Sequence, residues 1–370
     1  MKLLHLSDSH LGFSEYYKID IRTGINQREQ DFYDAWNRII DAILARKPDI
    51  VVHAGDLFHS PRPSNRAIKI ALQGIKKVIE LDIPFVVVAG NHETPRIRAT
   101  GSIFESLALF DHVYAAYQNR YERFTIKDVD IHCIPHCSLT SELDMAIQSV
   151  EFQKARYNIL VCHGAWAGDR LYGMGEFNEQ RLPDIEAKIR KEFDYIALGH
   201  YHRHLCIKPH VCYCGSTERT SLNEHNSSCG YLTVDLDSGK QEYITIDTRP
   251  MIRLPQLDCT GQSAVEIYDN LSHLVSPEID GAIVHLSLVN IEQDTFVKLD
   301  IRQFDDIFSS VFYLEKHLFR SADPAVESAH HSRIEAIPLE FERYIASLNL
   351  EETNLKKLSQ IGIDYLTRER

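Results

Sequence analysis

The sequence contains no apolar run of the roughly 18 residues that a membrane-spanning helix requires. Its opening stretch, MKLLHLSDSH, also lacks the charged region followed by a long apolar region that marks a secretory signal. Both absences predict a cytoplasmic protein with no membrane partner. The 370 residues are 44% hydrophobic and 25% charged, so the chain can bury a sizeable core, and its length suggests two or three domains.

An excess of basic residues is also missing, because the formal net charge is −13. Taken alone, this balance argues against a nucleic-acid partner, since binding to phosphates favours a basic surface. The average can nevertheless conceal a local basic patch. Carboxylates that bind metal ions also add negative charge without repelling a phosphate held by those ions. The net charge therefore makes a nucleic-acid partner less expected but does not exclude one.

Paired cysteines of the CxxC type are absent as well. The eight cysteines are spread through apolar segments such as NILVCHG, so we expect buried free thiols in a reducing compartment. A zinc site among Cys206, Cys212, Cys214 and Cys229 is disfavoured, because the paired spacing of zinc ribbons is missing.

Short β-rich runs alternate with helical patterns over about the first 200 residues. Apolar residues at helical spacing predict helices over 28–46 and 64–81. The runs KLLHLS, DIVVHAG, PFVVVAG, DIHCIPH, NILVCHG and DYIALGH predict strands. This alternation predicts an α/β fold over residues 1–250, a layered β-sandwich core with flanking helices.

The pattern changes at TRPMIRLPQLD, where prolines punctuate the chain. A helical pattern, a strand pattern, and then a further helix and strand predict a small α+β domain over 251–320. Residues 321–337 are polar and predict a linker, and residues 338–370 predict a C-terminal helical hairpin. The pattern leaves open whether this hairpin packs on its own chain or docks on a partner.

Five of the predicted strands end in polar residues, within LSDSH, HAGDLFH, AGNHE, VCHG and LGHYH. Because ligands in layered α/β folds collect at the carboxyl ends of strands, we expect these endings to converge on one site. Alternate residues of an extended segment point the same way, so Asp8 can converge with His10, and His200 with His202. The candidate metal ligands are Asp8, His10, Asp56, Asn91, His92, His163, His200 and His202.

Carboxylate, imidazole and amide oxygen suit hard or borderline ions such as Mn²⁺ and Fe²⁺. Asp56 can bridge two ions through its two oxygens, and the glycine before it lets the backbone approach them. Two such ions suit phosphoester cleavage, because they neutralise the phosphate and activate an attacking water. His92 is the natural candidate to protonate the departing oxygen. The ordered set DxH, GD, GNHE, H and GHxH predicts a dimetal phosphoesterase.

These motifs resemble the calcineurin-like metallophosphoesterase family. Within it, GDLFHSPRPS, GNHETPR, DYIALGHYH and YCGSTERTSLNE are similar to the nuclease subunit of DNA double-strand-break repair complexes, the SbcD type and its archaeal relatives. The histidine three residues after Asp56 is the repair-nuclease form, where protein phosphatases of this fold have GDxVDRG. The resemblance covers residues 1–250 closely and the remainder more loosely. It implies that residues 251–320 are a DNA-capping domain.

The resemblance also implies a role for each candidate residue. One ion would be held by Asp8, His10, Asp56 and His202, and the other by Asp56, Asn91, His163 and His200. His92 would act on the scissile phosphate or the leaving group, and His59 would position the DNA backbone. The loops SPRPSNR and TPRIR flank the site and supply candidate phosphate contacts, namely Arg62, Ser64, Arg66, Arg96 and Arg98.

The implied function is that of a two-metal DNA nuclease, with two Mn²⁺ ions per subunit, or Fe²⁺ or Mg²⁺ in their place. It would process double-strand-break ends as a 3′→5′ double-strand exonuclease and a single-strand endonuclease. The resemblance further implies a homodimer, a coiled-coil ABC-type ATPase partner (SbcC type) bound through 338–370, and a place at the nucleoid. Two alternatives stay open: a small-molecule or nucleotide phosphodiesterase of the same fold, and a scaffold that mainly anchors the ATPase.

Overall fold

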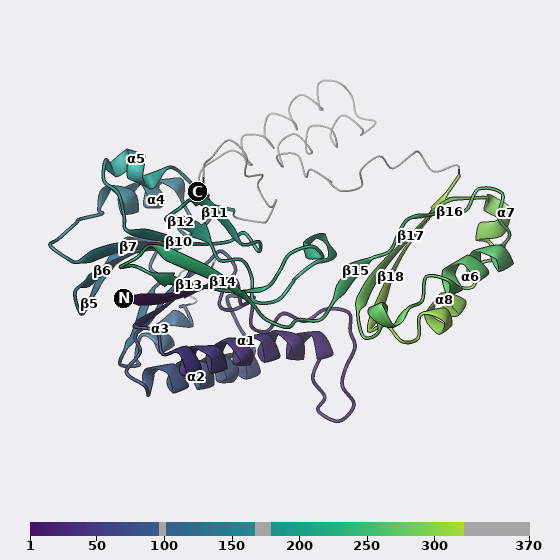
Figure 1. The fold of residues 1–370 in the computed structure, drawn as a ribbon, viewed down its shortest axis with the longest axis horizontal. Helices are drawn as coiled ribbons and strands as arrows, with labels where there is room; N and C mark the ends of the chain where they lie inside the picture. The colour runs from purple at the N-terminus through teal and green to yellow at the C-terminus, as the bar shows by residue number, and fades with distance from the viewer. Residues whose placement is uncertain (96–100, 167–178, 322–370) are drawn as a thin grey trace, which may run out of the picture. The chain divides into compact units, whose positions relative to one another are not determined.

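The computed structural model describes residues 1–95, 101–166 and 179–321, and two six-stranded sheets form its larger part (Figure 1). The first sheet has the strand order β14-β13-β1-β2-β3-β4. Its strands are β1 (Lys2–Leu6), β2 (Ile50–His53), β3 (Phe85–Val88), β4 (Val113–Ala116), β13 (Gly230–Asp235) and β14 (Lys240–Thr245). Strands β1 to β4 run parallel, and β13 and β14 complete the sheet in antiparallel pairings.

The second sheet has the order β11-β12-β10-β7-β6-β5. Its strands are β5 (Glu122–Ile126), β6 (Val129–Ile134), β7 (Tyr157–His163), β10 (Tyr195–Gly199), β11 (Leu205–Lys208) and β12 (Val211–Tyr213). The central strands β6, β7, β10 and β12 are parallel. Strands β7 and β10 therefore end at the same edge, where their last residues His163 and Gly199 are register partners.

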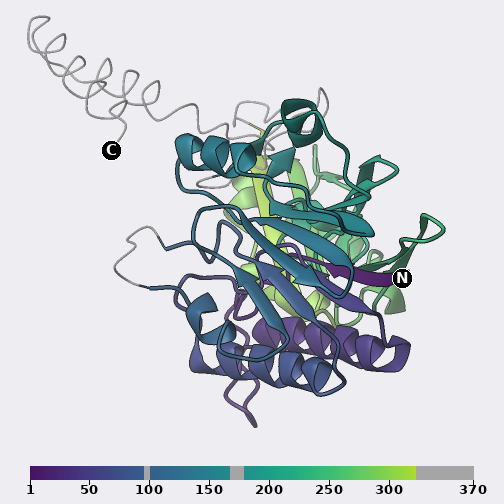
Figure 2. The ribbon, with the colours of Figure 1, turned by 90° about the vertical axis from the view of Figure 1, so that its left-hand side faces the viewer.

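Helices cover the outer faces of both sheets, as Figure 2 shows from the side. Helices α1 (Gln27–Arg46) and α2 (Asn65–Ile79) pack on the first sheet, and α4 (Thr140–Gln148) and α5 (Ile185–Ile189) on the second. Between the sheets lies a continuous apolar core that includes Val86, Ile131 and Val161. Three shorter elements belong to the same region: α3 (Phe104–Leu107), β8 (Ala165–Trp166) and β9 (Arg181–Leu182).

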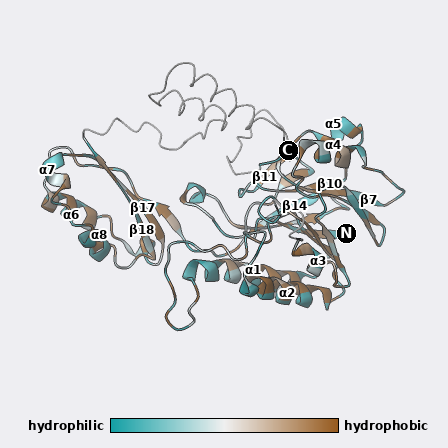
Figure 3. Cartoon of the chain, turned by 180° about the vertical axis from the view of Figure 1, so that it is seen from behind, coloured by the Kyte–Doolittle hydropathy of each residue, from teal (hydrophilic) through white to brown (hydrophobic). Residues whose placement is uncertain are grey.

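The two long helices form where the sequence pattern predicted them. Asn26 caps α1 by accepting hydrogen bonds from two backbone N–H groups, and Lys47 ends it in the left-handed conformation. Ser64 caps α2 in the same way through the N–H of Ala67. Each helix buries one apolar stripe, and Figure 3 shows hydrophilic and hydrophobic stretches along both. The predicted layered α/β fold is thus confirmed.

Residues 251–320 build a separate four-stranded sheet with its own core. The core joins Val284, Leu286 and Leu288 to residues of the covering helices. The elements are β15 (Met251–Arg253), β16 (Leu257–Asp258), α6 (Ala264–Ser272), a 3₁₀ turn η3 (Pro277–Ile279), β17 (Ile283–Ile291), α7 (Gln293–Phe296), α8 (Ile301–Ile307) and β18 (Tyr313–Arg320). A further 3₁₀ turn, η2 (Leu222–Glu224), precedes β13 in the larger part. The domain boundary at residue 250 stays a prediction.

The cysteine prediction needs a correction. Cys206 and Cys212 are register partners on the antiparallel pair β11–β12 and form a disulfide. The other six cysteines are buried free thiols, as expected. The disulfide also removes two of the four ligands considered for a zinc site.

The predicted linker beyond Ser321 and the helical hairpin over 338–370 lie outside the described residues. Arg96 and Arg98 lie outside them as well. Among the helices that the structure does describe, none combines the length and the apolar character needed to cross a bilayer.

Candidate metal centre

The ends of five strands, from both sheets of the sandwich, meet in one buried cluster. Three endings belong to the first sheet: Asp8 and His10 follow β1, Asp56 follows β2, and Asn91 and His92 follow β3. Two belong to the second sheet, because His163 closes β7 and His200 and His202 follow β10. Asp8, His10, Asp56, His163, His200 and His202 are each at most 4% exposed. The predicted convergence of the strand ends is therefore seen in the structure.

Asp56 lies at the middle of this cluster. Its Oδ2 atom is 3.3 Å from His163 Nε2 and 3.8 Å from His10 Nε2, while Oδ1 accepts the backbone N–H of His92 at 3.1 Å. Within the part of the chain that the structure describes, the buried Oδ2 accepts no hydrogen bond. A buried carboxylate oxygen without a hydrogen bond is costly unless a cation satisfies it. This atom has the place and the chemistry of a ligand shared by two ions.

On one side of Asp56 the ligand atoms of Asp8, His10 and His202 lie within 4.8 Å of one another. The Nε2 atoms of His10 and His202 are only 2.9 Å apart. Asp8 holds the next segment in place, since its carboxylate accepts the backbone N–H of His200 at 3.0 Å. Two imidazole nitrogens and a carboxylate at this separation match the donor set of a borderline divalent ion.

On the other side His163 is aimed at Asp56 and Asn91. Its Nδ1 atom lies 2.9 Å from the carbonyl oxygen of Ala54, which leaves Nε2 directed at Asn91 Oδ1, also 2.9 Å away. Burial acts to lower the pKa of His163, but the carboxylates of Asp56 and Asp8 outweigh it and raise the pKa to about 9. Burial likewise acts to raise the pKa of Asp56, and the His163 charge reverses this and holds it well below its usual range.

The backbone explains how these side chains converge, and it corrects the reason expected from sequence. Asp8, His10, Asp56 and His200 all have positive φ, between 41° and 106°. The segment Asp8–His10 is therefore not an extended strand with alternating side chains. Left-handed backbone turns the chain sharply after β1, β2 and β10 and brings these four side chains together. Such conformations are costly for non-glycine residues and cluster at functional sites.

The glycines of these motifs make room for the ligand side chains. A Cβ on Gly55 would stand 2.3 Å from His163 Nδ1, and one on Gly90 would stand 2.1 Å from Asp56 Oδ1. Gly55 also has φ +95°, which a side chain rarely adopts. From the sequence, Gly55 was expected to let the backbone approach the ions. In the structure it admits the His163 ring.

Three glutamates contact the cluster, and the sequence analysis assigned none of them a role. Glu93 is fully buried, and its carboxylate accepts the backbone N–H groups of Asp56, Phe58 and Gly90, which ties two strand ends together. Glu224 Oε1 lies 2.8 Å from His202 Nδ1, and Glu179 Oε1 lies 3.0 Å from His200 Nε2. The E of GNHE was a signal for Glu93, and the motif YCGSTERTSLNE ends at Glu224, whereas Glu179 lies outside the quoted motifs.

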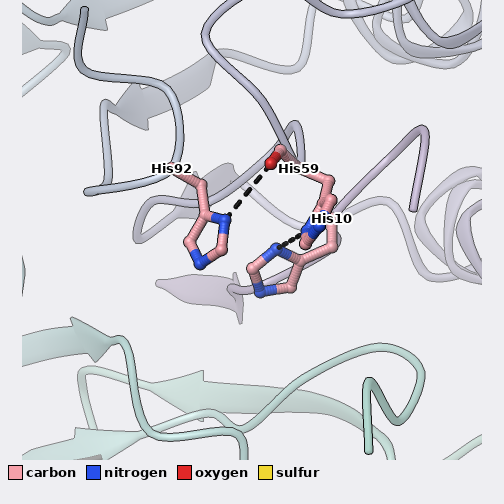
Figure 4. Close-up of side chains that lie close together, drawn as sticks. All are labelled: His10, His59 and His92. Carbon is pink, nitrogen blue, oxygen red and sulfur yellow. Dashed lines mark hydrogen bonds between the residues drawn. The ribbon is translucent and has the colours of Figure 1, made fainter. Parts of the chain in front are cut away.

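His59 and His92 stand at the rim of the cluster (Figure 4). Figure 4 shows the His92 ring nitrogen Nδ1 directed at the His59 carbonyl oxygen, 3.2 Å away, and His59 Nδ1 lies 3.3 Å from His10 Nδ1. Both side chains are part-buried, unlike the candidate histidine and aspartate ligands, which are buried. His53 differs from both, because it is fully buried behind the site with Nε2 2.9 Å from Ser9 Oγ.

The candidate DNA contacts that the structure describes lie on the segment before α2 and in the first turn of that helix. Arg62 is exposed. Ser64 is the N-cap of α2 and accepts the N–H of Ala67, and Arg66 forms an ion pair of 3.4 Å with Glu29. Two of these three side chains therefore also have structural partners within the chain.

The sequence of the chain is similar to those of known proteins. The family model described as calcineurin-like phosphoesterase matches residues 1–204. The DNA double-strand break repair protein Mre11 of Thermoplasma acidophilum is 30% identical over 354 residues, covering 88% of this chain and 85% of the relative. The Mre11 protein of Haloferax volcanii is 29% identical over 272 residues, which covers 72% of this chain and 56% of that relative. That of Methanocaldococcus jannaschii is 29% identical over 272 residues, 69% of each chain.

Proposed function

Because the chain belongs to the calcineurin-like phosphoesterase family, and to the Mre11 proteins within it, it is a metal-dependent phosphodiesterase, and we propose that it cuts the DNA backbone at double-strand breaks. One observation carries the proposal: the buried Oδ2 of Asp56 lies between two imidazole nitrogens that come from different sheets. This arrangement fits two divalent ions that share one carboxylate.

The two ions would have separate ligand sets that meet at Asp56. We propose that Asp8, His10, Asp56 and His202 hold one ion, and that Asp56, Asn91, His163 and His200 hold the other. Two Mn²⁺ ions suit these nitrogen and oxygen donors, and Fe²⁺ or Mg²⁺ are alternatives. Bound ions of this kind neutralise a phosphate and lower the pKa of a water molecule that attacks it.

The chain's own residues would complete the reaction. His92 lies at the rim, and Asp56 fixes its position through its backbone N–H. From there its imidazole would donate a proton to the departing oxygen of the DNA. The His59 ring, with its centroid 4.9 Å from that of His92, would hold the neighbouring phosphate. The residues beneath them, Glu93 and Glu224, would keep the ligand segments in register.

DNA would approach the rim past the segment before α2. We propose Arg62 as the main phosphate contact described, with Ser64 and Arg66 beside it, and Arg96 and Arg98 as further contacts. Residues 251–320 would cap the DNA. On broken ends we propose 3′→5′ exonuclease and single-strand endonuclease activity, in the cytoplasm at the nucleoid. A homodimer and an SbcC-type ATPase, bound through residues 338–370, complete the proposed complex.

The test is a cleavage assay with Mn²⁺ and end-labelled duplex DNA. We expect the wild type to shorten the duplex, and His92→Ala to lose at least about a hundredfold in rate, the usual contribution of a general acid. His112→Ala, which changes a half-exposed surface histidine, is the matched control and should cut normally.

A small phosphodiester serves as a second substrate in the same assay. Hydrolysis of this compound together with intact DNA would reject the nuclease and favour a small-molecule phosphodiesterase. If neither substrate is cut, even with the ATPase partner present, the scaffold alternative gains support.

A further inference from the structure

A second group of metal-ligating side chains lies on the sheet of residues 251–320. Strands β17 and β18 run parallel there, so that His285 is the register partner of Glu315 and Ser287 that of His317. Figure 1 shows α6 and α8 beside this sheet. Val284 and Leu286, the even-numbered neighbours of His285 and Ser287 on β17, belong to the apolar core that residues of these helices complete. Because successive strand residues alternate between faces, His285, Glu315 and His317 share the opposite face.

The three side chains are already gathered. Their ligand atoms all lie within 4.8 Å of one another. His317 Nε2 is 2.7 Å from Glu315 Oε1, and the rings of His285 and His317 have centroids 4.7 Å apart at an interplanar angle of 36°. The side chains of His317 and Glu315 are 42% and 34% exposed, so an ion can reach them from solvent.

We propose that His285, Glu315 and His317 form a zinc-binding site distinct from the strand-end cluster. Two imidazole nitrogens and a carboxylate oxygen are the His₂Glu donor set that Zn²⁺ takes, with a fourth position open to water or a ligand. The two sites share no residue. Neutral imidazoles in contact can both donate lone pairs to one cation, whereas two protonated rings at this distance would repel each other.

The arrangement needs no unusual backbone, because strand pairing alone sets it. His285 and Glu315 are held opposite one another by the ladder, and His317 follows Glu315 by two residues on the same face. A bound ion would thus link β17 to β18 without moving either strand. Arg253 on β15 is the register partner of His285 on its other side. The positive charge of Arg253 disfavours a bound cation nearby. A variant without this charge should therefore bind zinc more tightly.

The experiment is equilibrium dialysis of the full chain against Zn²⁺, with bound metal counted per chain. Because the strand-end cluster would also bind zinc through its imidazoles and carboxylates, the result to compare is the difference in bound zinc between variants. We expect His285→Ala and His317→Ala to bind one zinc ion fewer than the wild type. Glu315→Gln should lower the affinity for that ion by at least about tenfold. Arg253→Gln should raise the affinity for the same zinc ion by about twofold to fivefold.

His273→Ala is the matched control, since His273 is an exposed histidine of the same domain with a side chain 77% exposed. It should bind as many zinc ions as the wild type. Equal zinc counts in the wild type, His285→Ala and His317→Ala would overturn the proposal. If these variants do not fold, the test uses the wild type alone. Its histidines are chemically modified with and without zinc, and the modified residues are identified by mass spectrometry. Zinc should protect His285 and His317, and unchanged modification in saturating zinc would reject the site.

Discussion

The two histidine clusters of this chain are assembled in opposite ways. The strand-end cluster draws its side chains from five segments of two sheets, places four of these residues in left-handed backbone and buries most of the side chains. The cluster on β17 and β18 uses two neighbouring strands in regular pairing, and its side chains are partly open to solvent. The first arrangement is rigid and sensitive to every supporting residue. The second depends on little beyond the strand register.

This difference has a physical cause. Backbone in the left-handed region costs on the order of 1–3 kcal/mol per non-glycine residue, and burial of uncompensated carboxylates adds to that cost. A cluster of this kind persists only if its surroundings hold it firmly. Glu93 does so with three backbone hydrogen bonds, and Gly55 and Gly90 do so by leaving space. Replacing such residues should therefore reduce metal binding and DNA cleavage, whereas replacing residues of the cluster on β17 and β18 should not.

The largest effect is expected for Asp56→Ala. Because one carboxylate lies between both proposed ligand sets, both ions should be lost together, and DNA cleavage should fall by more than about a hundredfold. Metal analysis of the purified variant measures the first effect and the Mn²⁺ assay the second. Retention of one ion at full occupancy would contradict the shared ligand.

Gly90→Ala should come next. The added Cβ would stand 2.1 Å from Asp56 Oδ1, so the carboxylate has to move. A displacement near 1 Å costs about a hundredfold in rate. Gly239→Ala is the control, since its Cβ would meet nothing within 4 Å although its φ is +70°. It should cost about 1 kcal/mol of stability and leave cleavage unchanged. An equal loss of activity in both variants would show that steric contact with Asp56 is unimportant.

Glu224→Ala should have a smaller effect. Glu224 Oε1 lies 2.8 Å from His202 Nδ1 and orients that ring, so metal affinity should fall by about tenfold. A Mn²⁺ titration of cleavage measures the shift, and higher Mn²⁺ should restore the rate. Glu192→Ala, at an exposed position, should titrate like the wild type. A rate that stays low at saturating Mn²⁺ would indicate a role other than positioning His202.

The smallest effect is expected for His317→Ala in the absence of zinc. The side chain is part-exposed and its strand is held by the ladder, so unfolding free energy should change by less than about 0.5 kcal/mol. Cleavage with Mn²⁺ should stay within about twofold of the wild type. Denaturant unfolding and the same DNA assay provide the measurements. A large loss in either would mean that the two clusters are not independent.

Much of the fold was predictable because hydrophobic periodicity marks strands and helices locally. The predicted helices over 28–46 and 64–81 correspond to α1 and α2 within two residues at each end. The antiparallel additions β13 and β14 on one sheet and β11 on the other were not predicted. Strands β11 and β14 are largely exposed and carry little apolar pattern, whereas β13 is mostly buried and was overlooked. The Cys206–Cys212 disulfide was missed because it follows from the pairing of β11 with β12.

The candidate site was likewise predictable from the sequence only in part. The residues that gather at the site could be named from the sequence because each stands where an apolar run stops, which is a local signal. Their role as metal ligands stays a prediction. Their convergence was predicted as well, because the carboxyl ends of parallel strands meet at one edge. The added reason given for Asp8 and His10 was wrong, since they meet through left-handed backbone and not through strand alternation. Glu179 and Glu224 were missed because each reaches its histidine from a segment about 20 residues away in sequence, which no spacing rule anticipates.

The sequence by itself determined which residue types stand at the strand ends and in what order, because apolar runs and glycines encode where strands stop. Tertiary structure decided the distances among them, the side of the site that each faces, and the carboxylates that hold them. Those features depend on the stacking of two sheets, whose contacts join residues such as Ala54 and His163 across more than a hundred positions. It also decided that His285, Glu315 and His317 meet, since only the register of β17 with β18 places them on one face.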